Sequence, residues 1–273
     1  MTDADRAALE EIDFRLRILL PEEYQDSYET LEPVPMRAAG LTFDADGRVA
    51  WDRIWGSFCD LAMAGGPPHK GTLLGPGTAN EIAADRARYD EVIAETIRGV
   101  RMVTRLLIDA APAPGWIRLT CHSEEMAGWL LRAITMENVA VRGHGVALDL
   151  PVAPHFRLEK EIKNVVTVIA KTCHYWVGHM PRAQHGAIAD LFTALERSAP
   201  LVTPADGWRA VPCADTRQAI WRMRAMVAHN ILARREEHVL FVPVNHAADP
   251  DGARVARVVV NVERLAGLEG ARS

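Results

Sequence analysis

Apolar residues recur every three or four positions in several long stretches of the chain. Near the start, Ala7, Leu9, Ile12, Leu16 and Leu19 follow this spacing, and Pro21 ends it. Because an α-helix has 3.6 residues per turn, the pattern predicts a helix over residues 3–20 with one apolar face. The same reasoning predicts further helices over residues 52–64, 81–108, 158–176 and 181–198.

Shorter segments alternate apolar and polar residues, as half-buried strands do. Residues 36–43 and 49–51 read as strands around a turn at Asp44 to Gly47, which predicts a hairpin. Residues 254–263 alternate in the same way and are expected to form a strand.

One segment of the chain occurs twice. Residues 115–152 align with residues 207–244 at a constant offset of 92, without a gap, and 12 of the 38 aligned positions are identical. Average residue usage would give about two or three identities. The identities include rare residue types, namely two tryptophan pairs (Trp116/Trp208 and Trp129/Trp221) and one cysteine pair (Cys121/Cys213). The segment therefore reads as an internal duplication.

Each copy has the pattern of a β-α-β unit. A short strand leads to a helix N-cap at Ser123 or Asp215, and a second strand ends in Leu-x-x-Pro-Val. A unit of this kind is expected to be parallel and right-handed, with its ligand site at the carboxyl end of the first strand.

The predicted fold class is α/β, with two duplicated β-α-β units related by a pseudo-twofold axis. A helical pair joins the units, and a helix-rich N-terminal region precedes them. Residues 1–110 would carry the short hairpin and a Gly/Pro loop and pack on the duplicated region, 111–273, in one compact domain.

Composition and charge narrow the functional classes. The 49% hydrophobic and 25% charged content is that of a globular protein, and the net charge of −5 argues against a nucleic-acid partner. No apolar stretch is long enough to span a membrane, and the acidic N-terminus does not resemble a secretory signal. Four dispersed cysteines without a CxxC pair fit reduced thiols, so the expected location is the cytoplasm.

The loop over residues 65–78 is the first candidate for chemistry. It holds five glycines and three prolines, together with His69, Lys70, Gly71 and Thr72. Backbone amides in such a loop can bind an anion, and Lys70 would add charge. The loop is not a phosphate-binding P-loop, because Lys70 precedes the second glycine and the loop follows a helix. The alternative is a rigid connector.

A polar line along the predicted helix 158–176 is the second candidate. Its members include Lys171 and His174, in the series Lys160, Asn164, Thr167, Lys171 and His174. Residues of these types can line a polar cavity, although an ordinary solvated helix face is the alternative that the pattern favours.

The duplicated units supply the remaining candidates. His122 and Ser123 follow the first strand of copy one, and copy two has Ala214 in place of His122. Arg132 and Arg224 stand three residues after Trp129 and Trp221, so they are interpreted as surface cation–π pairs. The functional alternative is that both arginines converge on an anion.

The leading hypothesis is a cytoplasmic enzyme that acts on a small anionic metabolite. His69, His122 or His174 would transfer protons, and Lys70, Gly71, Thr72, Ser123, Lys171, Arg132 and Arg224 would bind the substrate. The alternative is a non-catalytic binding or assembly protein that uses the duplicated surface, with a homodimer as one form. A metal-dependent enzyme with Cys/His ligands comes third, without a spacing that defines a metal site. The sequence indicates no particular cofactor.

Overall fold

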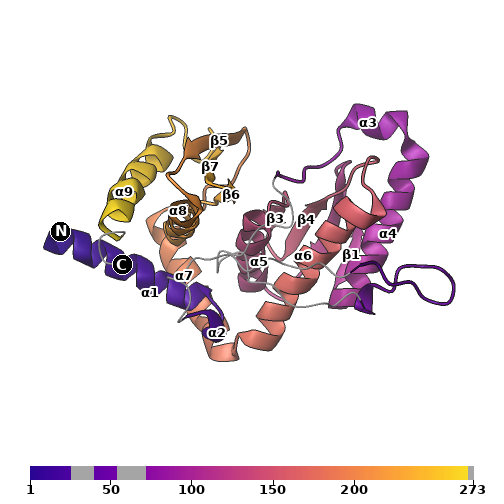
Figure 1. Cartoon of the computed structure of the whole chain (residues 1–273), viewed down its shortest axis with the longest axis horizontal. Helices are drawn as coiled ribbons and strands as arrows, with labels where there is room; N and C mark the ends of the chain where they lie inside the picture. The colour runs from indigo at the N-terminus through magenta and orange to yellow at the C-terminus, as the bar shows by residue number, and fades with distance from the viewer. Residues whose placement is uncertain (26–39, 54–71, 270–273) are drawn as a thin grey trace. The chain divides into compact units, whose positions relative to one another are not determined.

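The structure is a computed structural model that describes residues 1–25, 40–53 and 72–269 (Figure 1). The chain divides into two compact units. The middle unit comprises residues 33–62 and 66–178, and the terminal unit comprises residues 1–32, 63–65 and 179–273. Both units combine helices with a small antiparallel sheet. The presence of both helices and strands agrees with the predicted α/β class.

The middle unit is built on a four-stranded sheet. Its strands are β1 (Leu107–Ala110), β2 (Trp116–Thr120), β3 (Arg142–His144) and β4 (Ala147–Pro151), in the order β1-β2-β4-β3. Every neighbouring pair is antiparallel. The inner face of this sheet carries Ile108, Ile117, Leu119, Leu148 and Leu150, each 0% exposed.

Helices complete the core of the middle unit. They are α3 (Ala79–Ala84), α4 (Arg86–Thr104), α5 (Glu124–Met136) and α6 (Lys163–His174), with π-helical turns at Leu158–Ile162 and Tyr175–His179. Helix α5 packs on the inner face, where Leu131 lies over Gly143 of β3. Helix α6 packs against both α4 and α5.

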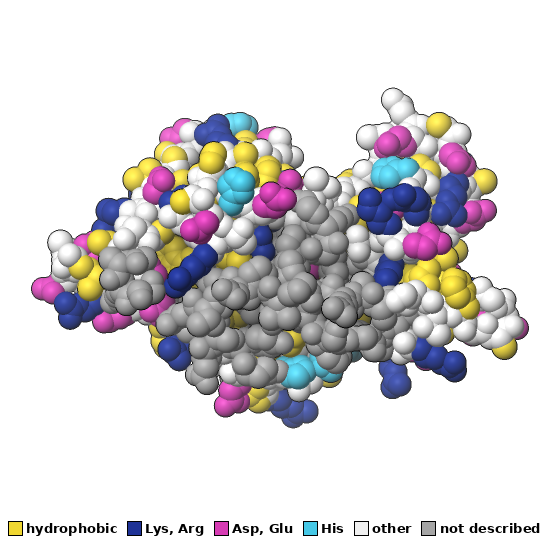
Figure 2. Space-filling view, viewed as in Figure 1, with side chains coloured by type: hydrophobic (Ala, Val, Ile, Leu, Met, Phe, Trp, Pro, Cys, Tyr) yellow, Lys and Arg dark blue, Asp and Glu magenta, His cyan; other side chains and the backbone are white. Residues whose placement is uncertain are grey.

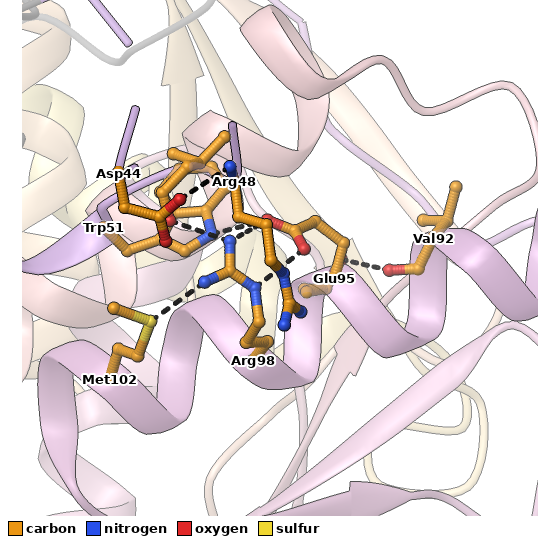
Figure 3. A network of polar contacts seen from close by, with 9 residues as sticks. Asp44, Arg48, Trp51, Val92, Glu95, Arg98 and Met102 are labelled. Atoms are coloured by element: carbon orange, nitrogen blue, oxygen red, sulfur yellow. Dashed lines mark hydrogen bonds and ion pairs between the residues drawn. The ribbon is translucent and has the colours of Figure 1, made fainter. Parts of the chain in front are cut away.

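A tight hairpin turn is attached to α4. The Asp44 side chain accepts hydrogen bonds from the backbone amides of Asp46 and Arg48, and Phe43 pairs with Val49. After the turn, a short 3-10 helix (Trp51–Arg53) places the Trp51 indole so that it donates to Glu95 Oε1 at 2.8 Å. Arg98 binds the same carboxylate and the Val49 carbonyl, so the turn and the helix form one polar network (Figure 3).

The terminal unit combines helices from both ends of the chain. Helices α1 (Asp3–Leu19), α7 (Arg182–Ser198), α8 (Thr216–Ala228) and α9 (Ala253–Glu269) pack together, and α2 (Glu22–Gln25) follows α1. Its sheet has the order β5-β7-β6, with β5 (Gly207–Pro212), β6 (Arg234–Glu236) and β7 (Val239–Val244). The predicted apolar face of the first helix is present, since Leu9, Ile12, Leu16 and Leu19 are all buried.

The two predicted copies carry the same elements at the same spacing. Helices α5 and α8 begin 92 residues apart and end 92 residues apart, and so do β3 and β6. Each helix has the predicted side-chain N-cap, Ser123 or Asp215. Asn138 and Asn230 both adopt a left-handed conformation just after their helices, with φ of 59° and 60°, which is the backbone that ends a helix at an asparagine or a glycine.

Three predictions of secondary structure were wrong. The two long strands of each copy pair antiparallel, because a third strand follows the helix and returns the chain, giving β-α-β-β. Residues 254–263 lie in helix α9, whose buried Val255, Val262 and Leu265 follow helical spacing. The helix predicted over 81–108 breaks at Asp85, which caps α4, and ends at Thr104 before strand β1.

Most of the predicted strand 36–43 and of the predicted helix 52–64 lies outside the described residues. None of the described helices is both long and apolar enough to cross a membrane. Acidic and basic side chains intermingle on the face of the described surface drawn in Figure 2.

Candidate functional site

The outer face of the middle-unit sheet, opposite α5, carries a row of charged side chains. In the strand register, Arg118 of β2 lies opposite Asp149 of β4, and Asp149 lies opposite Arg142 of β3. Directly opposite residues project from the same face of a sheet. Trp116 and His144 lie two residues from Arg118 and Arg142, so they share this face. We call Trp116, Arg118, Arg142, His144 and Asp149 the outer-face cluster.

Asp149 is the centre of the outer-face cluster. Its side chain is only 3% exposed, and Arg118 binds both carboxylate oxygens, with Nε–Oδ1 at 2.7 Å and a second nitrogen to Oδ2 at 3.0 Å. His144 Nε2 lies 3.2 Å from Asp149 Oδ2. The hydrogen bond with Asp149 raises the pKa of Arg118 above its ordinary value. The buried carboxylate therefore orients both a guanidinium and an imidazole.

Arg142 occupies the other side of Asp149. Its guanidinium carbon lies 3.6 Å from the centre of the Trp116 ring, a close cation–π contact. Burial lowers the pKa of Arg142, and the charge of Asp149 opposes that shift. In the described part of the chain, the Arg142 side chain makes no hydrogen bond or ion pair, and the residue is exposed. Its N–H groups are thus available to a ligand.

Two acidic and two basic side chains alternate along this row, because Asp109 of β1 lies opposite Arg118 and also lies 3.8 Å from Arg101. The N–H groups of Arg142 are therefore the donors that remain for a bound carboxylate or phosphate. The His144 side chain is half exposed, and imidazole is the side chain best suited to exchange protons at neutral pH. An anion held by Arg142 would lie beside an imidazole that a buried carboxylate orients. This is an arrangement that acid–base chemistry uses.

The corresponding positions of the terminal unit lack this chemistry. At the offset of 92, Arg118 corresponds to Ala210, Asp149 to Phe241 and His144 to Glu236. Only the arginine–tryptophan pair is shared, with Arg234 placed 5.1 Å from the Trp208 ring and 4.0 Å from the Phe241 ring. The stacked pair is therefore a common structural feature, whereas the Arg118–Asp149–His144 group is particular to the middle unit.

Comparison of the chain with protein-family models, with curated proteins and with solved structures finds no match. The proposed function therefore rests on the geometry of the outer-face cluster.

Of the candidate anion-binding residues in the loop 65–78, only some belong to the described part of the chain. His69, Lys70 and Gly71 lie outside the described residues. Thr72 is described and exposed, six residues before Thr78, the N-cap of α3. Their proposed role in anion binding stays a prediction.

His122 and Ser123 stand where the sequence placed them, between a strand and a helix. His122 is exposed, and the Ser123 hydroxyl accepts a hydrogen bond from the Met126 amide at 3.3 Å, as a helix cap does. Cys121, just before them, is buried, and burial raises its pKa to about 12, so it is a protonated thiol rather than a nucleophile.

The polar line on α6 is not a simple solvated face. Lys171 is 1% exposed and forms an ion pair with Glu137, which is 0% exposed, at the end of α5. The solvated interpretation was wrong for Lys171, because α6 packs this position against α5. His174, one turn further, is half-buried, and burial lowers its pKa, which favours the neutral imidazole.

Arg132 and Arg224 are not surface residues. They are 3% and 1% exposed, and Arg132 donates to the Gly128 carbonyl at 2.8 Å. The surface stacking predicted with Trp129 and Trp221 is wrong, since α5 and α8 are buried on nearly all sides. The arginines that stack on tryptophans are instead Arg142 and Arg234.

Among the described residues, no group of three histidine, cysteine or acidic side chains is arranged to hold a metal ion. The residues that sequence reasoning missed are Arg118, Arg142, His144 and Asp149. In the sequence they appear only as polar residues at alternate positions of short strands, and this pattern alone is weak evidence for a functional site. Only the antiparallel register brings them into one row.

Proposed function

We propose that this protein is an enzyme that binds a small anionic metabolite at the outer-face cluster and transfers a proton there. Arg142 would hold the carboxylate or phosphate of the substrate. His144 would exchange the proton, and Asp149 would orient His144 without touching the substrate. The observation that carries the proposal is the shared contact of Arg118 and His144 with buried Asp149, beside an unpaired Arg142.

The test is calorimetric titration of the protein with a panel of phosphorylated and carboxylated metabolites. We expect at least one to bind, and we expect Arg142→Gln to weaken that binding about 10- to 100-fold, the loss of a charge-assisted hydrogen bond. Arg209→Gln, at an exposed position of β5 in the terminal unit, is the matched control and should leave the affinity unchanged.

Proton transfer has a separate measurement. Titrations in two buffers of different ionisation enthalpy report the protons taken up on binding. We expect uptake of part of a proton near neutral pH, and we expect His144→Gln to abolish the uptake while retaining binding. If no anion binds, or if Arg142→Gln binds as well as the natural protein, the proposal is wrong. If an anion binds without proton uptake, the outer-face cluster is a binding site and the proposed proton transfer is wrong.

We also infer that residues 115–152 and 207–244 are two copies of one β-α-β-β module. The constant offset of their elements and the repeated arginine–tryptophan stack support this inference. Equivalent backbone hydrogen bonds support it too: the amides of Cys121 and Cys213 donate to Val146 and His238, again 92 residues apart. A pseudo-twofold relation between the copies stays a prediction.

Assembly is the second candidate function, and one observation favours it. In the middle unit, β1 covers the outer edge of β2, whereas in the terminal unit β5 is an edge strand of the described sheet. Its residues Arg209, Ala210 and Pro212 are exposed. An exposed strand edge pairs readily with another chain, so a homodimer through β5 is the form we propose.

A further inference from the structure

A second surface of the middle unit has the features of a ligand site that is separate from the outer-face cluster. It is a cavity of about 430 Å³ between the hairpin turn, α4 and the π-helical turn before α6. Its apolar lining comes from Phe43, Val49, Ala94, Leu158 and Ile162, and Arg48 stands at its edge. We call it the hairpin pocket. Its volume lies within the range of small-molecule sites.

The carboxylates beside the hairpin pocket are already neutralised. Glu95 receives two hydrogen bonds from Arg98, at 2.6 and 2.9 Å, and a third from the Trp51 indole at 2.8 Å (Figure 3). The bond with Glu95 raises the pKa of Arg98 above its ordinary value. Glu91 pairs with Arg88 at 2.9 Å, and Arg88 also donates to the Phe156 carbonyl. These acidic groups therefore leave no net negative charge at the pocket.

Arg48 differs from the other arginines of the hairpin pocket. Its backbone amide binds Asp44, but its guanidinium makes no hydrogen bond or ion pair with any residue that the structure describes. The side chain is exposed and labelled beside the network in Figure 3. Its guanidinium N–H groups are thus available to an anion at the edge of an apolar cavity, whereas the nearby Asp44 carboxylate is bound by backbone amides of the turn.

The turn that carries Arg48 is held in place before any ligand binds. Asp44 accepts from the amides of Asp46 and Arg48 and donates its own amide to the Arg48 carbonyl at 2.8 Å. Gly47 takes the positive φ of 73° that the turn requires. Because the backbone of the turn is already fixed, a ligand that contacts Arg48 has to order only the arginine side chain.

Phe43 gives the hairpin pocket an exposed apolar wall. Its side chain is 52% exposed, whereas Val49 and Ile162 at the floor are 2% and 1% exposed. A ligand with an apolar body would cover Phe43 and contact the floor residues. Its charged end would lie at Arg48.

We propose that the hairpin pocket binds an amphipathic monoanion, a carboxylate on an apolar chain or ring. The apolar walls select the body of the ligand, and Arg48 selects its charge. The site is independent of the outer-face cluster and of the reaction proposed there.

The test uses decanoate as the probe, titrated into the full-length protein below its micelle concentration. Binding is followed by calorimetry and by the fluorescence of the protein. Trp51 should report the binding, since its indole is bonded to a residue that lines the pocket. We expect saturable binding of decanoate. Octanoate should bind more weakly, by about fourfold for each methylene removed. Decyltrimethylammonium and decanol should bind at least tenfold more weakly than decanoate.

Two variants locate the binding. Arg48→Gln should weaken decanoate binding at least tenfold, and Ala94→Trp should fill the cavity and abolish it. Both positions are exposed, so neither change removes a core side chain. Arg86→Gln, at an exposed arginine of α4 that pairs with Asp90, is the matched control and should bind decanoate normally. Arg142→Gln should also bind it normally, which separates this site from the outer-face cluster.

Three outcomes would overturn the proposal. They are the absence of saturable binding, equal affinity for the cationic and anionic probes, and undiminished binding by both Arg48→Gln and Ala94→Trp. If only Arg48→Gln loses affinity, the apolar part of the ligand lies elsewhere and the pocket assignment fails.

Discussion

Single buried charges show how strongly the fold constrains individual residues. Lys171 and Glu137 are an ion pair that is shielded from water on all sides, with exposed fractions of 1% and 0%. Removing two charges from water costs several kcal/mol for each ion, and their mutual attraction offsets this only while both are present. The pair joins α6 to the end of α5 inside the core, and we expect the loss of one charge to destabilise the other.

The dependence of Lys171 and Glu137 can be measured by mutation. Lys171→Met should lower the free energy of unfolding by about 3–5 kcal/mol, because it removes the ammonium group that pairs with the buried Glu137 carboxylate. The double variant Lys171→Met/Glu137→Leu should recover most of that loss. Denaturant unfolding followed by circular dichroism provides both values. A loss below about 1 kcal/mol for the single variant would show that Glu137 is not charged in the folded protein.

At the scale of elements, the start of β2 depends on one glycine. Gly115 has φ of 85°, and a Cβ at this position would lie 2.6 Å from the Gly77 carbonyl oxygen. Gly207 occupies the position 92 residues later and is the first residue of β5, with φ of 125° but nothing within 4 Å of a Cβ. Gly115 and Gly207 therefore share the positive φ, whereas only Gly115 also lies in close contact with a neighbouring segment.

This difference predicts unequal effects of the same substitution. Gly115→Ala should destabilise the protein by about 3 kcal/mol or more, since it combines a strained backbone with a steric clash. Gly207→Ala should cost less, because only the backbone strain applies. Gly186→Ala is the control: it lies in α7 with nothing within 4 Å, and it should raise stability slightly. Thermal and denaturant unfolding of the three variants would rank them. Equal losses for Gly115 and Gly207 would contradict the role of the Gly77 contact.

At the scale of the whole molecule, the outer edge of β5 is the surface through which we propose that copies of the chain associate. The Cys213 amide donates toward β7, to the His238 carbonyl at 2.9 Å. Because amides alternate direction along a strand, those of Arg209 and Val211 also point to β7, whereas those of Trp208 and Ala210 point away. Pro212 has no amide to offer at this edge. A symmetric antiparallel pair centred on Ala210 would place Arg209 opposite Val211 of the partner and oppose no like charges.

A homodimer through β5 should be visible by light scattering during size-exclusion chromatography. We expect Ala210→Pro to convert the dimer to a monomer, because it removes an outward amide and leaves the bonds to β7 intact. Arg209→Gln should leave the dimer unchanged. If the natural protein remains monomeric up to high micromolar concentration, assembly through β5 is wrong.

The sequence by itself determined the elements that recur at the offset of 92 and the interactions between residues that are close together in the chain. The offset of 92 places α5 and α8, the caps Ser123 and Asp215, and the left-handed Asn138 and Asn230, because these depend on residues within a few positions of one another. It also placed the first helix correctly, since its apolar face is continuous.

The tertiary structure decided which residues meet across strands and which polar groups are buried. The direction of β4 depends on the short strand β3 that returns the chain, a feature too brief to produce a hydrophobic period. For the same reason the sequence could not bring Arg118, Arg142, His144 and Asp149 together, because the row exists only in the antiparallel register. Lys171 and Arg132 looked like surface residues, and only the packing of helices around them shows that they are buried. Helix caps and turns depend on residues that are close together in the sequence, whereas strand register and burial depend on contacts between distant segments.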